Sequence, residues 1–258
     1  MSTVRVLVLR AAGINCDEEI VHAWRLAGAD PALLHIARVA DDSAVLDRFH
    51  VVTIPGGFSY GDDIAAGTIL AQWVTQDLAD GLRKLVARGG GILGVCNGFQ
   101  VLVKAGLLPG GEFGRDAVTV TYNDSAKFEA RWVRMQVCTA KCPFVTPGAS
   151  LEMPVEHAEG KVVTADDGVT DRLERAGQIA LRYVDEQGRS DQYPANPNGS
   201  VAGIAGLCDP TGRIFGLMPH PDRHYDHTQH PLWTRRTCPP SSIPDGLSVF
   251  RNAVEYWK

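Results

Sequence analysis

The segment Gly94-Val-Cys96-Asn97-Gly98 places a cysteine between two glycines, after an apolar run and before a run with helical spacing. This pattern is typical of a nucleophile elbow, where a sharp turn from strand to helix exposes the attacking atom, here a thiol sulfur. The positive end of the following helix favours the thiolate, and its free N–H groups, especially that of Asn97, can stabilise an oxyanion. A buried, unreactive cysteine is the alternative, but the flanking glycines favour a nucleophile at Cys96.

His220 has the best context for the proton carrier that a thiolate nucleophile needs. Among the eight histidines, it lies just past an apolar run, where the catalytic loops of an open α/β sheet collect. Pro221 favours an extended conformation at His220, and in an extended chain residues i and i+2 share a face. Asp222 can therefore orient the His220 ring, which predicts a triad of Cys96, His220 and Asp222. A purely structural histidine is the alternative.

The segment around His220 is rich in groups that could bind a metal ion. They are His220, Asp222, His224, Asp226, His227 and His230. Prolines on either side indicate a loop rather than a preformed cage, so we predict no metal site here. We expect His224, His227 and His230 to lie at the surface or to face a partner.

Two other patterns do not support a cofactor site. Gly89, Gly91 and Gly94 spell the G-x-G-x-x-G of dinucleotide-binding proteins, but they end a helical run and enter a strand, the reverse of that motif's setting. Cys138 and Cys142 have no second cysteine or histidine pair nearby, so a zinc site is not expected there. The sequence also contains no phosphate-binding G-x-x-x-x-G-K-[ST] motif.

The composition argues against several classes of protein. Of 258 residues, 45% are hydrophobic and 21% are charged, and the formal net charge is −5, as in a globular protein with a full-sized core. There is no basic run, so neither a nucleic acid nor a membrane surface is an expected partner. A chain that enters a strand at once is expected to lack a signal peptide and to be cytoplasmic. Its six cysteines, at positions 16, 96, 138, 142, 208 and 238, should then be reduced.

The elements that must position these groups alternate between strands and helices. Apolar runs predict strands at residues 4–9, 31–36, 51–54, 92–95 and 214–217. Helical spacing predicts helices at residues 16–26, 62–88 in two pieces, 97–104 and 246–257. Because the strand runs are apolar almost throughout, they are typical of parallel strands that are covered on both faces.

From about residue 113 the pattern changes to short β-like runs between turns. These runs lie at residues 132–138, 151–155, 161–163 and 179–184. We therefore predict an α/β fold, a doubly wound, mostly parallel open sheet with an antiparallel β extension. No linker or repeat is evident, which predicts a single domain over residues 1–258. The turn-dense segment 193–200 is either a structured connection or a surface for a ligand or partner.

Four motifs carry a resemblance to a known family. They are Pro55-Gly-Gly-Phe-Ser-Tyr-Gly-Asp-Asp-Ile64, Gly94-Val-Cys-Asn-Gly-Phe-Gln100, Tyr193-Pro-Ala-Asn-Pro-Asn-Gly-Ser200 and Gly216-Leu-Met-Pro-His-Pro221. Together they resemble the class I, triad-type glutamine amidotransferases, whose fold is flavodoxin-like. More narrowly, they are similar to the glutaminase subunits of phosphoribosylformylglycinamidine synthase, an enzyme of purine biosynthesis.

The resemblance implies a role for each matched residue. Cys96 would attack the side-chain amide of L-glutamine, and His220 would protonate the leaving ammonia and then activate water. Backbone N–H groups of Gly57 and Asn97 would stabilise the oxyanion, with Gly56 keeping the loop tight.

The resemblance also implies that Gln100 contacts the bound glutamine and that the ammonia is used by partners. The ammonia would pass to a large subunit, which binds ATP and Mg²⁺ and converts formylglycinamide ribonucleotide to its amidine. A small third subunit would bridge the two. This chain itself would hold no cofactor and no metal.

Two positions depart from the family pattern. The third member of the triad is usually a glutamate, whereas this chain has Asp222, which is shorter by one methylene, about 1.5 Å. The N-terminal loop at residues 10–17 is also less rich in proline than expected. Within that loop, Cys16 is interpreted as a structural or supporting residue rather than a second nucleophile.

Two alternatives stay open at this point. The same fold and triad support free-standing γ-glutamyl hydrolases and other cysteine hydrolases. A catalytically silent regulatory subunit is the second alternative, with Asp222 as a sign of decay. For a glutaminase subunit, we expect low activity in isolation, since an ungated subunit would waste glutamine.

Overall fold

The computed structural model describes residues 3–236 and 242–258, and its central feature is a nine-stranded sheet. The strands of the sheet are β1 (Arg5–Arg10), β2 (Asp30–His35), β3 (Val51–Ile54), β4 (Gly91–Val95), β6 (Glu129–Val137), β7 (Ser150–His157), β9 (Ile179–Tyr183), β10 (Ile204–Cys208) and β11 (Ile214–Leu217). Their order across the sheet is β2-β1-β3-β4-β11-β10-β9-β6-β7. The predicted α/β class is thus confirmed.

The first five strands in this order are mutually parallel and form the doubly wound half. Strands β3, β4 and β11 are buried along their whole length, as their apolar sequences predict. Ile54 is paired with Gly94, and Val95 with Leu217, so the carboxyl ends of these three strands meet at one edge. The loops that follow them must therefore converge there.

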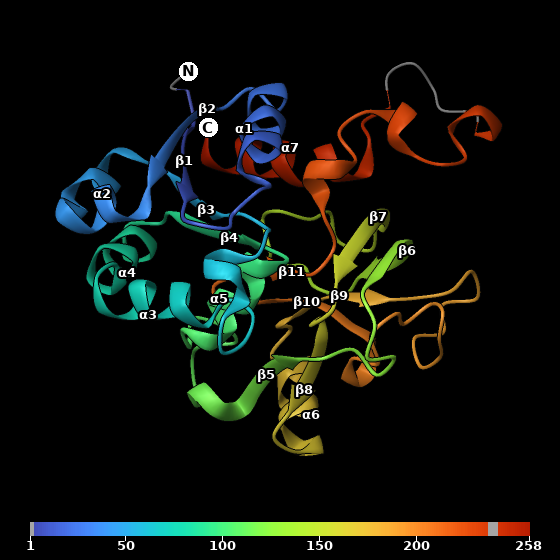
Figure 1. The fold of residues 1–258 in the computed structure, drawn as a ribbon. Helices are drawn as coiled ribbons and strands as arrows, with labels where there is room; N and C mark the ends of the chain where they lie inside the picture. The colour runs from blue at the N-terminus through green and yellow to red at the C-terminus, as the bar shows by residue number, and fades with distance from the viewer. Residues whose placement is uncertain (1–2, 237–241) are drawn as a thin grey trace.

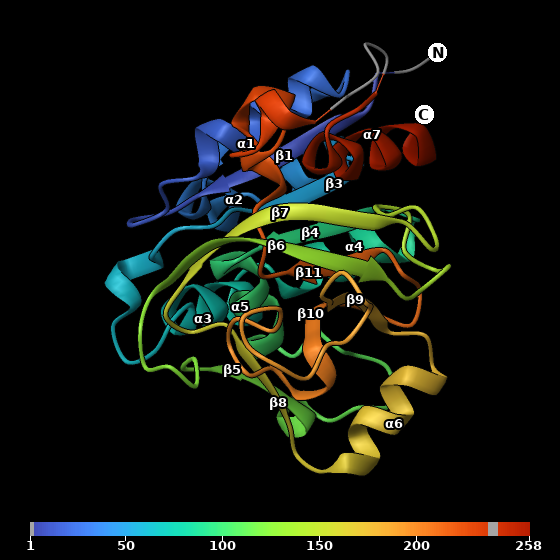
Figure 2. The ribbon, with the colours of Figure 1, turned by 90° about the vertical axis from the view of Figure 1, so that its right-hand side faces the viewer.

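Helices cover both faces of this half, as Figures 1 and 2 show. One face carries α1 (Asp17–Leu26) and α7 (Asp245–Trp257), and the other carries α3 (Thr68–Gln76), α4 (Ala79–Ala87) and α5 (Asn97–Lys104). Trp24 of α1 packs edge-on against Phe250 of α7, with ring centroids 5.0 Å apart, and its indole N–H donates to Thr53 Oγ1 of β3. The first and the last α-helix of the chain, α1 and α7, thus pack together on the same face of the sheet.

The remaining strands of the large sheet form the predicted antiparallel extension. A separate pair of antiparallel strands, β5 (Val118–Thr121) and β8 (Lys161–Thr164), lies below the sheet in Figure 2, next to α6 (Asp167–Arg175). The sequence did not predict β5, β10 or α6. In α6 only Val169 and Leu173 are buried, so its apolar spacing is too sparse to indicate a helix.

Two element boundaries also differ from the sequence-based expectation. Ile36 begins a short helix, α2 (Ile36–Asp41), instead of ending a strand, because the His35 ring accepts a hydrogen bond from the N–H of Ala37 and caps it. The expected two-piece helix starts at Thr68 rather than Asp62. The preceding residues form a tight turn in which Tyr60 has a left-handed backbone with φ of 54°.

No helix in the described residues is long and apolar enough to cross a membrane. The five cysteines in this part of the chain are all free thiols, as expected. The sixth, Cys238, lies outside the described residues.

Candidate active site

Cys96 sits at the turn between β4 and α5 in a strained backbone conformation, with φ of 50° and ψ of −104°. Its N–H donates to Leu217 O (2.8 Å), and its carbonyl accepts from the N–H of Gln100 (3.1 Å) at the start of the helix. A Cβ on Gly98 would lie 1.9 Å from Ile54 O, and one on Gly94 would lie 2.6 Å from Gly98 O. Both glycines are therefore needed for the turn to pack this closely, as in a nucleophile elbow.

The thiol of Cys96 faces a small cleft of about 90 Å³. The cleft is lined by Asn15, Cys16, Gly57, Phe58, Cys96, Phe128, Glu156, His220 and Arg223. Cys96 is 5% exposed, and its sulfur lies 3.6 Å from the carbonyl oxygen of Glu156. Two larger hollows, of about 690 and 610 Å³, contain none of the predicted site residues, so we assign the chemistry to the small cleft.

His220 and Asp222 lie past the end of β11, which neighbours the strand that leads to Cys96. Both side chains are buried, and His220 Nδ1 lies 3.4 Å from each carboxylate oxygen of Asp222. Burial alone would lower the pKa of His220. The charges of Asp222 and Cys96 oppose it and hold that pKa well above its usual value. The site therefore favours an imidazolium ring, which can stabilise a thiolate and later give up its proton.

Gly56 and Gly57 follow β3 and complete the site. A Cβ on Gly56 would lie 2.7 Å from His220 Cε1, which is too close, so glycine leaves room for the His220 ring. Gly57 has φ of 136° and forms an isolated antiparallel bridge with Ile14. A side chain there would meet the backbone of Ile14 at 2.9 Å, which fixes the loop at the edge of the cleft.

The side chains of Asn97 and Gln100 form a buried network behind the elbow. Asn97 donates to Asp62 Oδ1 (3.0 Å) and to Gln100 Oε1 (2.9 Å), and its Oδ1 accepts from the N–H of Ser59 (3.3 Å). The amide of Gln100 donates to the carbonyl of Glu159. The network therefore ties the loop after β3 and the loop after β7 to the first turn of α5. A contact between Gln100 and bound glutamine stays a prediction.

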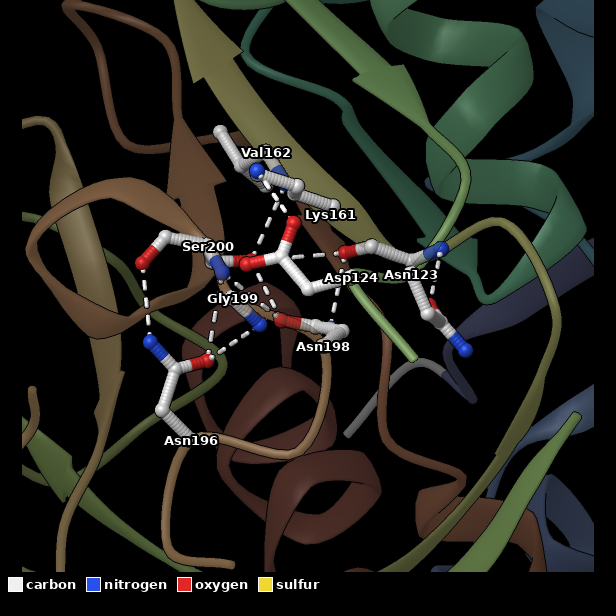
Figure 3. Close-up of polar contacts among 9 residues, drawn as sticks. Asn123, Asp124, Lys161, Val162, Asn196, Asn198, Gly199 and Ser200 are labelled. Atoms are coloured by element: carbon white, nitrogen blue, oxygen red, sulfur yellow. Dashed lines mark hydrogen bonds and ion pairs between the residues drawn. The ribbon is translucent and has the colours of Figure 1, made fainter. Parts of the chain in front are cut away.

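The turn-dense loop 193–200 folds around its own polar side chains, which point toward one another in Figure 3. Asn196 Nδ2 donates to Ser200 O (2.9 Å), and its Oδ1 accepts from the N–H of Gly199 (3.1 Å). Asn198 Oδ1 accepts from the hydroxyl (2.7 Å) and the N–H (3.0 Å) of Ser200. The side chains of Asn196, Asn198 and Ser200 are buried, which supports a structured connection.

This loop also holds one wall of the cleft in place. Asn198 Nδ2 donates to Gly160 O (2.8 Å). The side chain of Asn123 accepts from the N–H of Gly160 (3.0 Å) and donates to His157 O (2.8 Å). These contacts fix the segment 156–160, in which the carbonyl groups of Glu156 and Glu159 face the elbow. The motif thus contributes to the site through positioning, without lining the cleft itself.

The charged side chains of Glu156 and Arg223 were not predicted to have a functional part, and Cys16, interpreted as a structural or supporting residue, lies beside them in the cleft. Arg223 Nη2 lies 3.4 Å from Cys16 Sγ, and its Nη1 pairs with Glu156 Oε2. Arg223 directly follows the triad segment, so its position in the sequence was a signal. Cys16, His220 and Asp222 form the one group of three potential metal ligands in the described residues, with ligand atoms within 4.8 Å of one another.

The expectation that His224 and His230 lie at the surface is wrong. Both are buried and pack edge-on against Trp132, with centroid distances of 4.9 and 4.5 Å. His224 Nδ1 contacts Glu152 O (2.7 Å), and His230 Nε2 lies 3.2 Å from Glu152 Oε2. Burial lowers the pKa of both rings. They fill the space beneath Trp132, which the local sequence did not indicate.

This geometry agrees with a comparison to known families. Residues 3–257 match the CobB/CobQ-like glutamine amidotransferase domain. Since the match covers nearly the whole chain, the protein belongs to this family, and it is a glutamine amidotransferase.

Similar proteins narrow the class further. A phosphoribosylformylglycinamidine synthase subunit PurQ from Dehalococcoides mccartyi is 40% identical over 258 residues, covering 99% of this chain and 98% of the relative. One from Methanococcus maripaludis is 36% identical over 265 residues, covering 98% of each. A chain in the solved structure of PurLQS from Thermotoga maritima is 31% identical, with a TM-score of 0.75 and full coverage of both chains. The resemblance to these glutaminase subunits is therefore confirmed.

Proposed function

We propose that this chain is the glutaminase subunit of a phosphoribosylformylglycinamidine synthase and that Cys96, His220 and Asp222 do its chemistry. One observation carries the proposal. Cys96, with its strained backbone, and the buried His220–Asp222 pair follow neighbouring parallel strands, and Cys96 and His220 meet at one cleft. The names of the relatives supply the class of synthase.

In the proposed reaction, the thiolate of Cys96 attacks the side-chain amide carbon of glutamine, and the oxyanion is stabilised by the N–H groups of Gly57 and Asn97. His220 gives its proton to the leaving nitrogen, which departs as ammonia and leaves a γ-glutamyl thioester. His220 then takes a proton from water, whose oxygen attacks the thioester and releases glutamate. Asp222 keeps the ring oriented and stabilises its charge throughout.

The ammonia is proposed to pass to an ATP-dependent large subunit that converts formylglycinamide ribonucleotide to its amidine. A relative occurs in a structure whose name joins three subunits, PurLQS, which supports a large and a small bridging partner. ATP and Mg²⁺ would be bound by the large subunit, and the reaction at Cys96 needs neither. We further propose that residues 1–258 act as one domain, as the continuous sheet suggests, and that the protein is cytoplasmic.

Glutamate release from glutamine tests this function. We expect turnover that requires Cys96 and rises strongly when the large subunit, ATP and formylglycinamide ribonucleotide are added. Turnover that is indifferent to these additions would support a free-standing hydrolase instead. No turnover in any mixture would support a silent regulatory subunit.

A further inference from the structure

Two charged side chains at the cleft have no part in the proposed reaction. Arg223 and Glu156 both line the cleft beside Cys96, and each is 30% exposed at its side chain. The other charged groups of the described lining are the His220 ring and the Cys96 thiolate, which the proposed reaction already uses. Once Cys96 and His220 are assigned to the reaction, Arg223 and Glu156 are therefore the guanidinium and the carboxylate that the described lining offers to the rest of a bound molecule.

Arg223 is held firmly at this position. It ends the short turn η5 (Pro221–Arg223), so a single turn supplies Asp222 and the guanidinium just after His220. Its Nη1 pairs with Glu156 Oε2, its Nη2 lies 3.4 Å from Cys16 Sγ, and Glu19 of α1 lies 3.9 Å away. A cation fixed by partners on β7 and at the start of α1 is pre-organised to bind an anion.

Glutamine carries an α-carboxylate and an α-ammonium group in addition to the amide that reacts. When the amide carbon of glutamine lies at Cys96, four carbon–carbon bonds separate that carbon from the carboxylate carbon. The two carbons are then about 5 Å apart. The guanidinium has five N–H donors, so it can retain one bond to Glu156 and offer a fork to a carboxylate. Glu156 in turn offers an acceptor to an ammonium group.

We propose that Arg223 binds the α-carboxylate of glutamine and that Glu156 binds its α-ammonium group, which restricts the cleft to free α-amino acids. This inference rests on the proposed function. It assigns a recognition role to two residues, whereas Cys96, His220 and Asp222 carry out the reaction.

A purely structural clamp is the competing explanation, because the Arg223–Glu156 pair also joins β7 to the turn after His220. The two explanations differ in selectivity. A clamp that fails would weaken all ligands of the cleft alike. A recognition pair that fails would weaken only the ligands that carry the matching charge.

Ligand binding to the full chain, in its complex with the partner subunits and with Cys96→Ala to prevent turnover, distinguishes these explanations. The probes are glutamine, 4-aminobutanamide, which lacks the carboxylate, and glutaramic acid, which lacks the ammonium group. We expect Arg223→Gln to weaken glutamine binding about 10- to 100-fold, the range of a charged hydrogen bond, and to leave 4-aminobutanamide unchanged. Glu156→Gln should weaken the binding of glutamine and leave the binding of glutaramic acid unchanged.

Two further variants complete the test. Arg223→Lys keeps the charge without the fork and should lie between the wild type and Arg223→Gln. Arg83→Gln makes the same change on the exposed face of α4, where Arg83 pairs with Asp80, and should alter nothing. Equal weakening of all three probes by Arg223→Gln, or unchanged glutamine binding, would overturn the proposal. If wild-type complex binds glutamine but releases no glutamate, the proposed function fails and the recognition pair stands.

Discussion

His220 and Asp222 face each other across a gap that is long for a charge-assisted hydrogen bond. His220 Nδ1 lies 3.4 Å from both carboxylate oxygens, whereas such bonds usually span about 2.7–2.9 Å. Asp222 is fully buried, and in the described part of the chain its Oδ1 has no hydrogen-bond donor. Asp222, which is one methylene shorter than glutamate, therefore interacts with the His220 ring mainly by electrostatic attraction. This interaction affects both catalysis and stability.

Substitution of Asp222 tests its orienting role. Asp222→Glu extends the carboxylate by about 1.5 Å and should keep kcat within about tenfold of the wild type. Asp222→Asn removes the charge that stabilises the imidazolium and should lower kcat by about 10²- to 10⁴-fold. The measurement is steady-state glutaminase activity of the assembled complex. Equal activity of the asparagine variant and the wild type would remove Asp222 from the proposed triad.

The pKa of His220 predicts a pH-dependent stability. Burial lowers this pKa, but the charges of Asp222 and Cys96 raise it well above the ordinary value of 6.5. A folded-state pKa above the unfolded one stabilises the fold fully below about pH 6.5, and this contribution is lost as the pH rises through the folded pKa. The stability difference between wild type and Asp222→Asn should therefore be largest near pH 6 and shrink at higher pH. Urea unfolding over a pH series measures it, and a difference that grows with pH would contradict this account.

The elbow should not accept a side chain at Gly98. A Cβ there would lie 1.9 Å from Ile54 O, so α5 or β3 must move. We expect Gly98→Ala to destabilise the protein by about 1–3 kcal/mol, as overpacking does, and to abolish most activity by shifting Cys96. Thermal unfolding and glutamate release measure both effects. Gly114→Ala is the matched control, since a Cβ at Gly114 meets no atom within 4 Å.

The loop 193–200 should matter for activity although it does not line the cleft. Asn198→Ala removes the bonds to Gly160 O and Ser200 and leaves buried groups unpaired, which costs about 1–3 kcal/mol. Because Gly160 lies in the segment that carries Glu156 of the cleft, kcat should fall as well. Asn252→Ala is the control, because it also removes a side-chain hydrogen bond to a backbone carbonyl, that of Phe144. Loss of stability with unchanged kcat would separate the loop from the site.

The local parts of the site could be predicted from the sequence. Cys96 lies between Gly94 and Gly98 in the segment that makes the whole elbow, and His220 and Asp222 are two residues apart. Both the elbow and the His220–Asp222 pair can therefore be predicted from neighbouring residues alone. The parallel half of the sheet was predictable for the same reason, because its strands are continuous apolar runs that are buried on both faces.

Most features that the sequence analysis did not predict depend on contacts between distant segments of the chain. Glu156 reaches Arg223 across 67 positions, so neither residue signals the pair by itself. His224 and His230 were predicted to be exposed because nothing near them in the sequence indicates that Trp132, on strand β6, covers them. Helix α6 is the exception, since its signals are local: Asp166 caps it, and its buried face consists of only Val169 and Leu173.

The most direct test of the central claim is the mass of the γ-glutamyl intermediate on the enzyme. The complex is quenched in acid during glutamine turnover, and the peptides of this chain are analysed by mass spectrometry. We predict a γ-glutamyl group on the peptide that contains Cys96, its loss in Cys96→Ala, and an unmodified Cys16 peptide in both. Steady glutamate release with the adduct on Cys16, or undiminished release by Cys96→Ala, would contradict the account.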